Sequence, residues 1–147
     1  MGIFIPTEEQ MVEIFLRNWK ESERQKSLFV REVRINQKKI YLIQIPKYKN
    51  NHLGIGHAIE FKLKNWKDCL NQAKKNRLFM PMNTIAIWKT YISEVKKEDL
   101  IEEGIGLIEV SKKKNRTILK PQRSQFTDRF LYSKLRKQIL RDEMGKK

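Results

Sequence analysis

The sequence predicts an α/β fold: one domain with a central mixed β-sheet flanked by helices. The chain has 147 residues, the usual size of a single domain. Its composition, 39% hydrophobic and 10% aromatic, supplies enough material for a core although 33% of the residues are charged. Segments with the periodicity of strands alternate with segments of helical periodicity, and no repeat or low-complexity linker interrupts them.

The first half of the chain is expected to form a helix and then three strands. The helix is predicted over 7–24, because Pro6 and Thr7 suit a helix start and apolar residues then recur at helical spacing. Each strand is a short run rich in β-branched and aromatic residues, bounded by polar or glycine-containing turns. The three strands are expected at 28–35, 40–45 and 57–63.

The second half is expected to alternate helices and strands. A helix over 66–76 precedes the apolar run 84–88, which is typical of a strand covered on both faces. A short acidic helix over 96–103 ends at Gly104, a residue that favours helix termination. Two strands and a basic helix complete the chain, at 105–110, 117–120 and about 125–143. The predicted core therefore spans about 7–121.

The chain carries a net charge of +15, and two-thirds of this excess lies near its end. Residues 112–147 hold 13 Lys and Arg against 3 acids. Such a surplus favours a polyanionic partner, nucleic acid before a membrane surface, because basic side chains release counterions from phosphates. We expect double-stranded DNA as the first partner. The expected phosphate-binding residues are Lys112, Lys113, Lys114, Arg116, Lys120 and Arg123.

Other function classes are disfavoured by simple counts. A single cysteine, Cys69, excludes a disulfide framework and a cysteine-rich zinc site. No apolar run approaches the roughly 18–20 residues that span a bilayer, and no secretory signal is visible. We therefore expect a reduced, cytoplasmic protein without a membrane partner.

The triplet Glu60-Phe61-Lys62 is the most pointed local feature. Residues two apart on a strand share one face, so a carboxylate and an ammonium group are expected side by side. Burying a charged side chain on a core strand costs free energy, because the charge is removed from water. A buried Glu and Lys together therefore suggest a functional reason. An exposed, salt-bridged strand face would explain the same triplet without any chemistry.

The residues around this triplet resemble a known family. Gly56–Trp66 followed by Leu70–Ala73 resembles archaeal nuclease-like proteins of the PD-(D/E)XK superfamily, which have the restriction-endonuclease fold. Val30–Val33 and Gly104–Val110 support the same resemblance, which covers about Thr7 to Pro121.

The resemblance implies a metal-dependent DNA endonuclease or exonuclease. In such sites carboxylates hold Mg²⁺ or Mn²⁺, which activates water, and a lysine positions the nucleophile. By position, Glu60 is expected to bind the metal and Lys62 to be the catalytic lysine. Gln72 is similar to a glutamine that some relatives aim at the active site, and Glu13 or Glu32 could supply a further carboxylate.

One departure from the family pattern concerns its leading aspartate. The matching strand holds no acid, Tyr41 occupies the aspartate's place, and the first aspartate of the chain is Asp68. A phenol is a poor Mg²⁺ ligand, because hard cations prefer carboxylate oxygen. Either Glu32 replaces the missing ligand, or the site is degenerate and the protein binds DNA or RNA without cutting.

The C-terminal segment places an apolar stripe along a basic helix, formed by Phe126, Phe130, Leu131, Leu135 and Ile139. By default such a stripe packs on its own domain. It could instead pair with a second copy and give a homodimer, which makes an oligomerising interaction module an alternative function. A helix lying on a membrane is the weakest of the three readings, because polar residues interrupt the apolar face.

Overall fold

Six strands pair side by side in chain order in the computed structural model, which describes residues 4–22, 26–35, 38–48 and 52–144. The strands are β1 (Ser27–Ile35), β2 (Lys38–Pro46), β3 (His57–Lys62), β4 (Met82–Trp88), β5 (Gly106–Val110) and β6 (Asn115–Leu119). The helices are α1 (Glu8–Ser22), α2 (Trp66–Asn76), the 3₁₀ helix η2 (Lys89–Glu94), α3 (Lys97–Glu103) and α4 (Arg129–Met144). The predicted α/β class and the predicted order of helices and strands are confirmed, with η2 as an addition.

The sheet is mixed. β1, β2 and β3 form an antiparallel meander, β3, β4 and β5 run parallel, and β6 returns antiparallel at the edge. Parallel neighbours need long crossover connections, and α2 supplies the first while η2 and α3 supply the second. The parallel strands therefore occupy the middle of the sheet.

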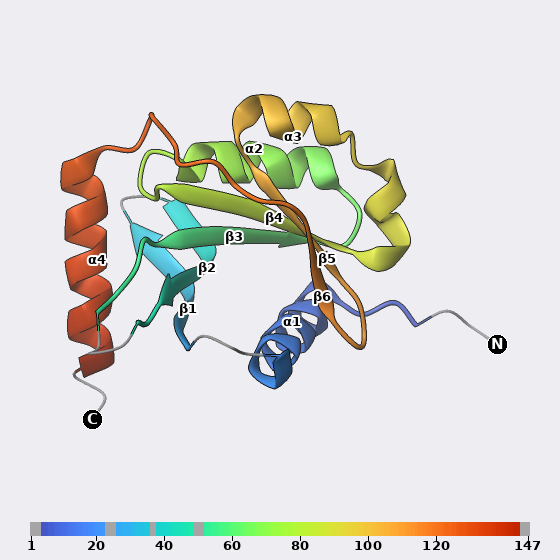
Figure 1. The fold of residues 1–147 in the computed structure, drawn as a ribbon, viewed down its shortest axis with the longest axis horizontal. Coiled ribbons are helices and arrows are strands. Elements are labelled where there is room, and N and C mark those ends of the chain that lie inside the picture. Colours follow the sequence, from blue (N-terminus) through green and yellow to red (C-terminus); the bar gives the residue numbers. More distant parts are fainter. Residues whose placement is uncertain (1–3, 23–25, 36–37, 49–51, 145–147) are drawn as a thin grey trace.

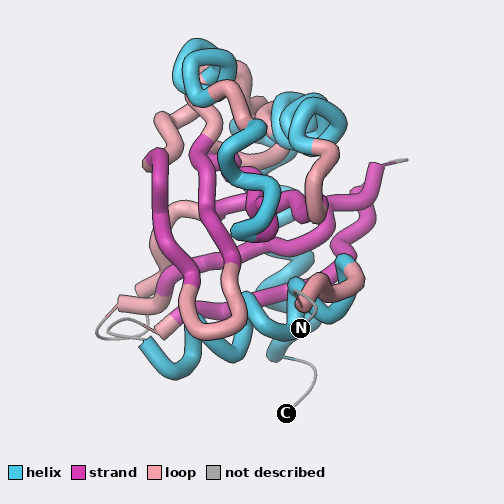
Figure 2. The backbone as a smooth tube through the Cα atoms, turned by 90° about the vertical axis from the view of Figure 1, so that its right-hand side faces the viewer, coloured by secondary structure: helices cyan, strands magenta, loops and turns pink. Residues whose placement is uncertain are grey.

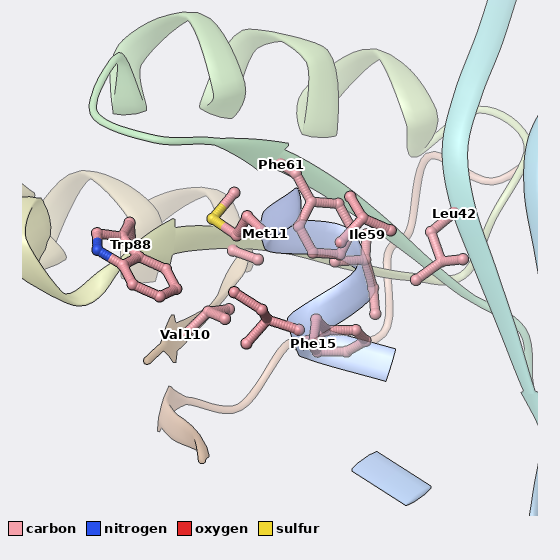
Figure 3. Close-up of a cluster of buried hydrophobic side chains, with 10 residues drawn as sticks. Met11, Phe15, Leu42, Ile59, Phe61, Trp88 and Val110 are labelled. Atoms are coloured by element: carbon pink, nitrogen blue, oxygen red, sulfur yellow. The ribbon is translucent and has the colours of Figure 1, made fainter. Parts of the chain in front are cut away.

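Helices cover both faces of the sheet (Figures 1 and 2). On one face α1 packs Met11 and Phe15 against strand residues that include Phe61 and Trp88 (Figure 3). On the other face α2 and α3 cover β4 and β5, and α4 covers β1 and β2. Every residue from Asn83 to Trp88 is buried, which confirms that β4 is covered on both faces.

Local signals fix the ends of two helices. At the start of α1, the Thr7 N–H donates to Gln10 Oε1 over 2.9 Å, and the Gln10 N–H donates to Thr7 Oγ1 over 3.1 Å. This reciprocal capping box satisfies two backbone donors that the first turn leaves free. At the end of α3, Gly104 has a φ of 70°, the left-handed conformation that glycine adopts without a Cβ clash.

The C-terminal helix begins at Arg129, about four residues later than expected. The segment before it is irregular and is bonded to the loops at the ends of α2, α3 and β4: the Gln122, Ser124 and Asp128 N–H groups donate to the carbonyls of Gly104, Pro81 and Leu78. Asp128 Oδ1 then accepts the Leu131 N–H over 3.0 Å, as an N-cap residue does.

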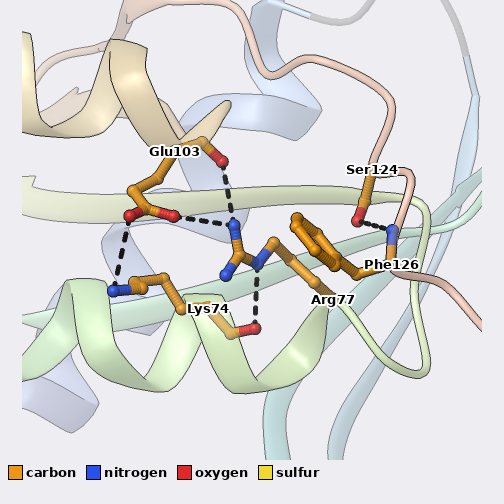
Figure 4. Close-up of polar contacts among 5 residues, drawn as sticks. All are labelled: Lys74, Arg77, Glu103, Ser124 and Phe126. Atoms are coloured by element: carbon orange, nitrogen blue, oxygen red, sulfur yellow. Dashed lines mark hydrogen bonds and ion pairs between the residues drawn. The ribbon is translucent and has the colours of Figure 1, made fainter.

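The predicted apolar stripe is shorter than expected. Leu135 and Ile139 are buried against the molecule's own sheet, whereas Phe130 is 74% exposed. Phe126 lies outside the helix, with the Arg77 guanidinium 4.7 Å from its ring centroid (Figure 4). The expected homodimer through this helix stays a prediction, and its buried stripe serves the fold of one chain.

No helix among the described residues is long and apolar enough to cross a membrane.

The packing of α4 gives a test of this assignment. Leu135→Ala should lower the free energy of unfolding by about 2–5 kcal/mol, because it leaves a cavity in a closed core. Phe130→Ala on the same helix should change it by less than about 0.5 kcal/mol, because the ring is exposed. Urea unfolding of both variants measures the difference. If both variants lost the same free energy of unfolding, at several protein concentrations, this result would contradict the described packing of α4.

Candidate functional site

Glu60 is buried in the middle of the sheet, on the side covered by α2. Its neighbours Ile59 and Phe61 point to the α1 side, and Glu60 alternates to the other face. The side chain is only 8% exposed. Its Oε2 accepts the Asn76 Nδ2–H over 2.9 Å and the Tyr41 backbone N–H over 3.1 Å. The carboxylate thus ties together β3, β2 and α2.

The bond to Tyr41 explains why a carboxylate sits at this place. The pairing of β2 with β3 includes Leu42 opposite Ile59 and does not extend to Tyr41 opposite Glu60. A backbone N–H without a ladder partner must find another acceptor when it is away from water. Glu60 Oε2 is that acceptor.

Burial raises the pKa of Glu60 above its ordinary value, because it penalises the ionised form. The hydrogen bonds from Asn76 and Tyr41 and the positive charges of Lys38 and Lys62 act in the opposite direction. The pKa remains raised, so desolvation is the largest effect on this carboxyl group.

Gln72 and Asn76 approach this part of the molecule from one face of α2. Lys38 Nζ donates to Gln72 Oε1 over 3.3 Å, and burial lowers the pKa of this lysine while the charge of Glu60 opposes the shift. Lys38 and Asn76 are site residues that sequence reasoning missed. The signal for Asn76 was its position four residues after Gln72, which places both on one helix face. Lys38 lay in an expected turn and gave no signal.

Lys62 is placed differently from Glu60, although both lie on the same face of β3. Its Nζ lies 3.7 Å from Glu8 Oε1 and 3.6 Å from Asp68 Oδ2, and about a third of its side chain is exposed. These two carboxylates belong to the first turns of α1 and α2. The lysine therefore joins two helix starts at the end of the strand.

The other two expected metal ligands have separate partners. Glu13 is ion-paired with Arg31 at 2.6 Å, and Glu32 with Lys39 at 3.6 Å. Glu32 also has a φ of 53°, an uncommon left-handed backbone for this residue type. Both ion pairs are solvent-exposed: the first joins α1 to β1 and the second joins β1 to β2, and neither involves Glu60.

The acids expected to bind a metal together with Glu60 are spread out and engaged elsewhere in the structure. No three His, Cys, Asp or Glu side chains within the described ranges gather as a group that could hold a metal ion. Mg²⁺ takes carboxylate oxygens in near-octahedral geometry, whereas Glu60 Oε2 already accepts two protein hydrogen bonds. We derive no catalytic step through a metal from this arrangement.

Tyr41, at the position expected for an aspartate, contributes its backbone to the site. Its ring packs on the α1 side, 5.6 Å from the Phe61 ring centroid. Burial and nearby carboxylates, Glu8 first, raise the pKa of its phenol, which keeps the hydroxyl protonated.

The predicted phosphate-binding residues are divided along β6. Lys112, Lys113 and Lys114 are exposed in the turn between β5 and β6, whereas Lys120 and Arg123 follow the other end of β6. Between them, Arg116 donates to Glu109 Oε2 over 3.0 Å. A strand rises about 3.3 Å per residue, so the two exposed groups lie well apart. The basic helix α4 lies at the opposite end of the molecule from the turn (Figure 1).

The turn that carries Lys112–Lys114, here called the lysine turn, is hydrogen-bonded to α1. Arg17 donates to the Lys112 carbonyl over 2.7 Å, and Asn18 Nδ2 donates to the Ser111 carbonyl over 2.9 Å. Asn115 Nδ2 returns a bond of 2.9 Å to the Phe15 carbonyl. The three lysines therefore project from a backbone that is held in place on both sides.

No protein-family model matches this chain, and no curated protein matches it. Among solved structures, the chain is similar to the SPO1766 protein of unknown function from Silicibacter pomeroyi. The similarity covers 97% of each chain with a TM-score of 0.61 and 13% sequence identity. At that identity the comparison supports the fold alone.

The burial of Glu60 predicts a specific dependence of stability on pH. Because its pKa is raised in the folded state, the folded protein holds this proton more tightly than the unfolded chain. Relative to Glu60→Gln, the free energy of unfolding of the wild type should therefore fall as pH rises from below the ordinary value of 4.5 through the raised pKa. Urea unfolding of both proteins between acidic and neutral pH measures this difference, and parallel profiles would contradict it.

Glu60→Ala is the matched variant for the hydrogen bonds. It leaves the Asn76 amide and the Tyr41 N–H without their acceptor, at a cost of about 1–3 kcal/mol for each buried donor. Glu60→Gln can keep an acceptor oxygen in the same place. The alanine variant should therefore be the less stable of the two at neutral pH.

Proposed function

We propose that this protein binds nucleic acid through the lysine turn, defined as Lys112–Lys114, and that its nuclease-like fold does not cut the bound strand. One observation carries the proposal: three consecutive lysines are exposed on a fastened turn, and none of them has an ion-pair partner among the described residues. Uncompensated positive charge held at fixed positions is what a phosphate backbone requires.

The order of elements supports a restriction-endonuclease-like fold as part of this proposal. A helix, three antiparallel strands, a second helix and a parallel strand follow one another, and Glu60 and Lys62 lie on the third strand. This is the arrangement in which the sequence resemblance expects the E-x-K pair. Function is a property of the site, however, and the site must be argued by itself.

The contacts of Glu60 favour a structural role for it over a catalytic one. Its Oε2 closes a gap between two strands and anchors α2, and the raised pKa works against the ionised form that a metal ligand needs. Two of the expected partner carboxylates, Glu13 and Glu32, are engaged by Arg31 and Lys39.

A metal-dependent phosphodiesterase is the second candidate, and one observation favours it. Lys62 has two carboxylates, Glu8 and Asp68, within 4 Å, and Glu60 lies two residues before it on the same strand. This gives a lysine with three acids nearby at the end of a central strand. A bound divalent cation could draw on these acids only after the two ion pairs of Lys62 are released.

The binding proposal predicts a salt-dependent affinity that depends on the lysine turn. The triple variant Lys112→Gln, Lys113→Gln, Lys114→Gln should bind duplex DNA more weakly. It should also lower the slope of log K against log salt by about two to three, since each phosphate contact contributes about 0.9. Fluorescence anisotropy over a salt series measures both quantities.

The matched control neutralises three other exposed lysines, Lys64, Lys96 and Lys97. Because the net charge changes by the same amount, this variant separates contact at the turn from long-range attraction. We expect it to lose little of the salt slope. Equal losses in both triple variants would refute the assignment of the turn, and absence of salt-sensitive binding would refute the proposed function.

Cutting is tested directly by incubating plasmid, duplex and single-stranded DNA with the protein in Mg²⁺, Mn²⁺ or EDTA. We expect binding without metal-dependent cleavage. Cleavage that is abolished in both Glu60→Gln and Lys62→Gln would replace our proposal with the phosphodiesterase, since both substitutions keep the size of the side chain and remove its charge chemistry.

A further inference from the structure

A hollow beside the lysine turn extends the proposed function to a particular kind of nucleic acid. It has a volume of about 370 Å³, within the range of roughly 300–1,000 Å³ of small-molecule sites. Its walls come from three parts of the chain: the segment before α1, the junction of β4 with η2, and the lysine turn. The lining residues are Phe4, Trp88, Lys89, Thr90, Ser111 and Lys112–Lys114.

The charge around this hollow has one sign. Four of its lining residues are lysines, and the lining includes no Asp or Glu. These lysines are all exposed, so their ammonium groups are available to a ligand. An anion with several negative oxygens, such as a phosphate, is the complementary ligand.

The same hollow also has an aromatic wall. The Phe4 ring is 46% exposed, and Lys112 Nζ lies 5.5 Å from its centroid. Phe4 stands at 74° to Trp88 with 6.0 Å between the ring centroids. Trp88 is 3% exposed and belongs to the buried cluster on the α1 side (Figure 3). Its edge-to-face contact with Phe4 therefore joins the exposed ring to the core. An exposed aromatic ring held by a buried one is a platform for a flat ligand.

From this geometry we propose that the hollow takes one unpaired nucleotide, with its base on Phe4 and its phosphate on the lysine turn. The proposal rests on the proposed function and names its ligand class: single-stranded nucleic acid or a free nucleotide, which share this chemistry. Bases in a duplex are stacked on each other and cannot reach the ring, whereas an unpaired base presents a free face.

A second exposed phenylalanine shows why the choice falls on Phe4. Phe126 is 67% exposed and, like Phe4, has a cation over its ring. That cation, Arg77, is ion-paired with Glu103 at 2.8 Å (Figure 4). The groove beside Phe126 is lined by Glu102 and Glu103 as well as Arg77 and Arg123, so its charge is mixed. Phe126 therefore serves as a matched control: an exposed ring of the same kind without an all-positive surround.

The experiment compares three fluorescent probes with the full chain: a single-stranded thymidine oligomer, an oligomer of the same length with abasic sugars, and a blunt duplex. The two single strands carry the same phosphates and differ only in their bases. We expect the thymidine oligomer to bind about 5- to 150-fold more tightly than the abasic one, the effect of one stacked base.

Substitutions assign this preference to the hollow. Phe4→Ala should reduce the ratio of thymidine to abasic affinity to about 1. Phe4→Tyr should retain this ratio, and Phe126→Ala should leave it unchanged. The Lys112–Lys114 triple variant should weaken binding of both single strands together. Because Phe4 lies at the surface, far-ultraviolet circular dichroism is expected to show a folded Phe4→Ala protein.

The outcomes separate this inference from the proposed function. Salt-sensitive binding with equal affinities for thymidine and abasic strands, or a preference that survives Phe4→Ala, would overturn the nucleotide site and leave the binding function intact. Loss of binding to every probe would overturn both. Competition by thymidine monophosphate as strong as by the oligomer identifies a free nucleotide as the ligand, and competition by the oligomer alone identifies the single strand.

Discussion

The three parallel strands in the middle of the sheet are buried on both faces, by α1 on one side and by α2 and α3 on the other. Such strands leave room for a polar side chain only where its hydrogen bonds are made inside the molecule. Glu60 and Glu109 are the carboxylates buried there among the described residues. Glu109 is ion-paired with Arg116, whereas Glu60 accepts hydrogen bonds from two neutral donors. Burial raises the pKa of the Glu60 carboxyl, and its two hydrogen bonds act in the opposite direction without cancelling that shift.

The core also holds in place the lysine turn that we assign to binding. α1 is packed into the sheet through Phe15 and, at the same helix turn, bonds to both sides of the β5–β6 connection. A short turn held in this way loses little further freedom when it meets a ligand. The lysine side chains are exposed on a backbone that α1 holds in place.

The basic residues of the chain are distributed differently in space than in sequence. Residues after 111 carry most of the excess charge, yet the strand β6 and the segment 120–128 carry the chain from one end of the molecule to α4 at the other (Figures 1 and 2). Along this path Arg116 forms an ion pair with Glu109. Residues that look like one patch in the sequence thus become two separate surfaces, with one of them beside an aromatic hollow.

The sequence by itself determined the α/β class, the order of elements and the bounds of α2, because periodicity and caps act over a few residues. It also singled out Glu60 as a charge on a core strand. The partners of Glu60 were decided by tertiary structure alone: Asn76 lies sixteen residues away and the Tyr41 N–H nineteen. The packing of α2 brings the first, and the end of the β2–β3 pairing leaves the second to the side chain. Glu13 and Glu32 were plausible ligands in sequence, but in the structure they are ion-paired with Arg31 of β1 and Lys39 of β2. Local patterns record which residues are buried, whereas the pairing of charges depends on distances that exist only in the folded chain.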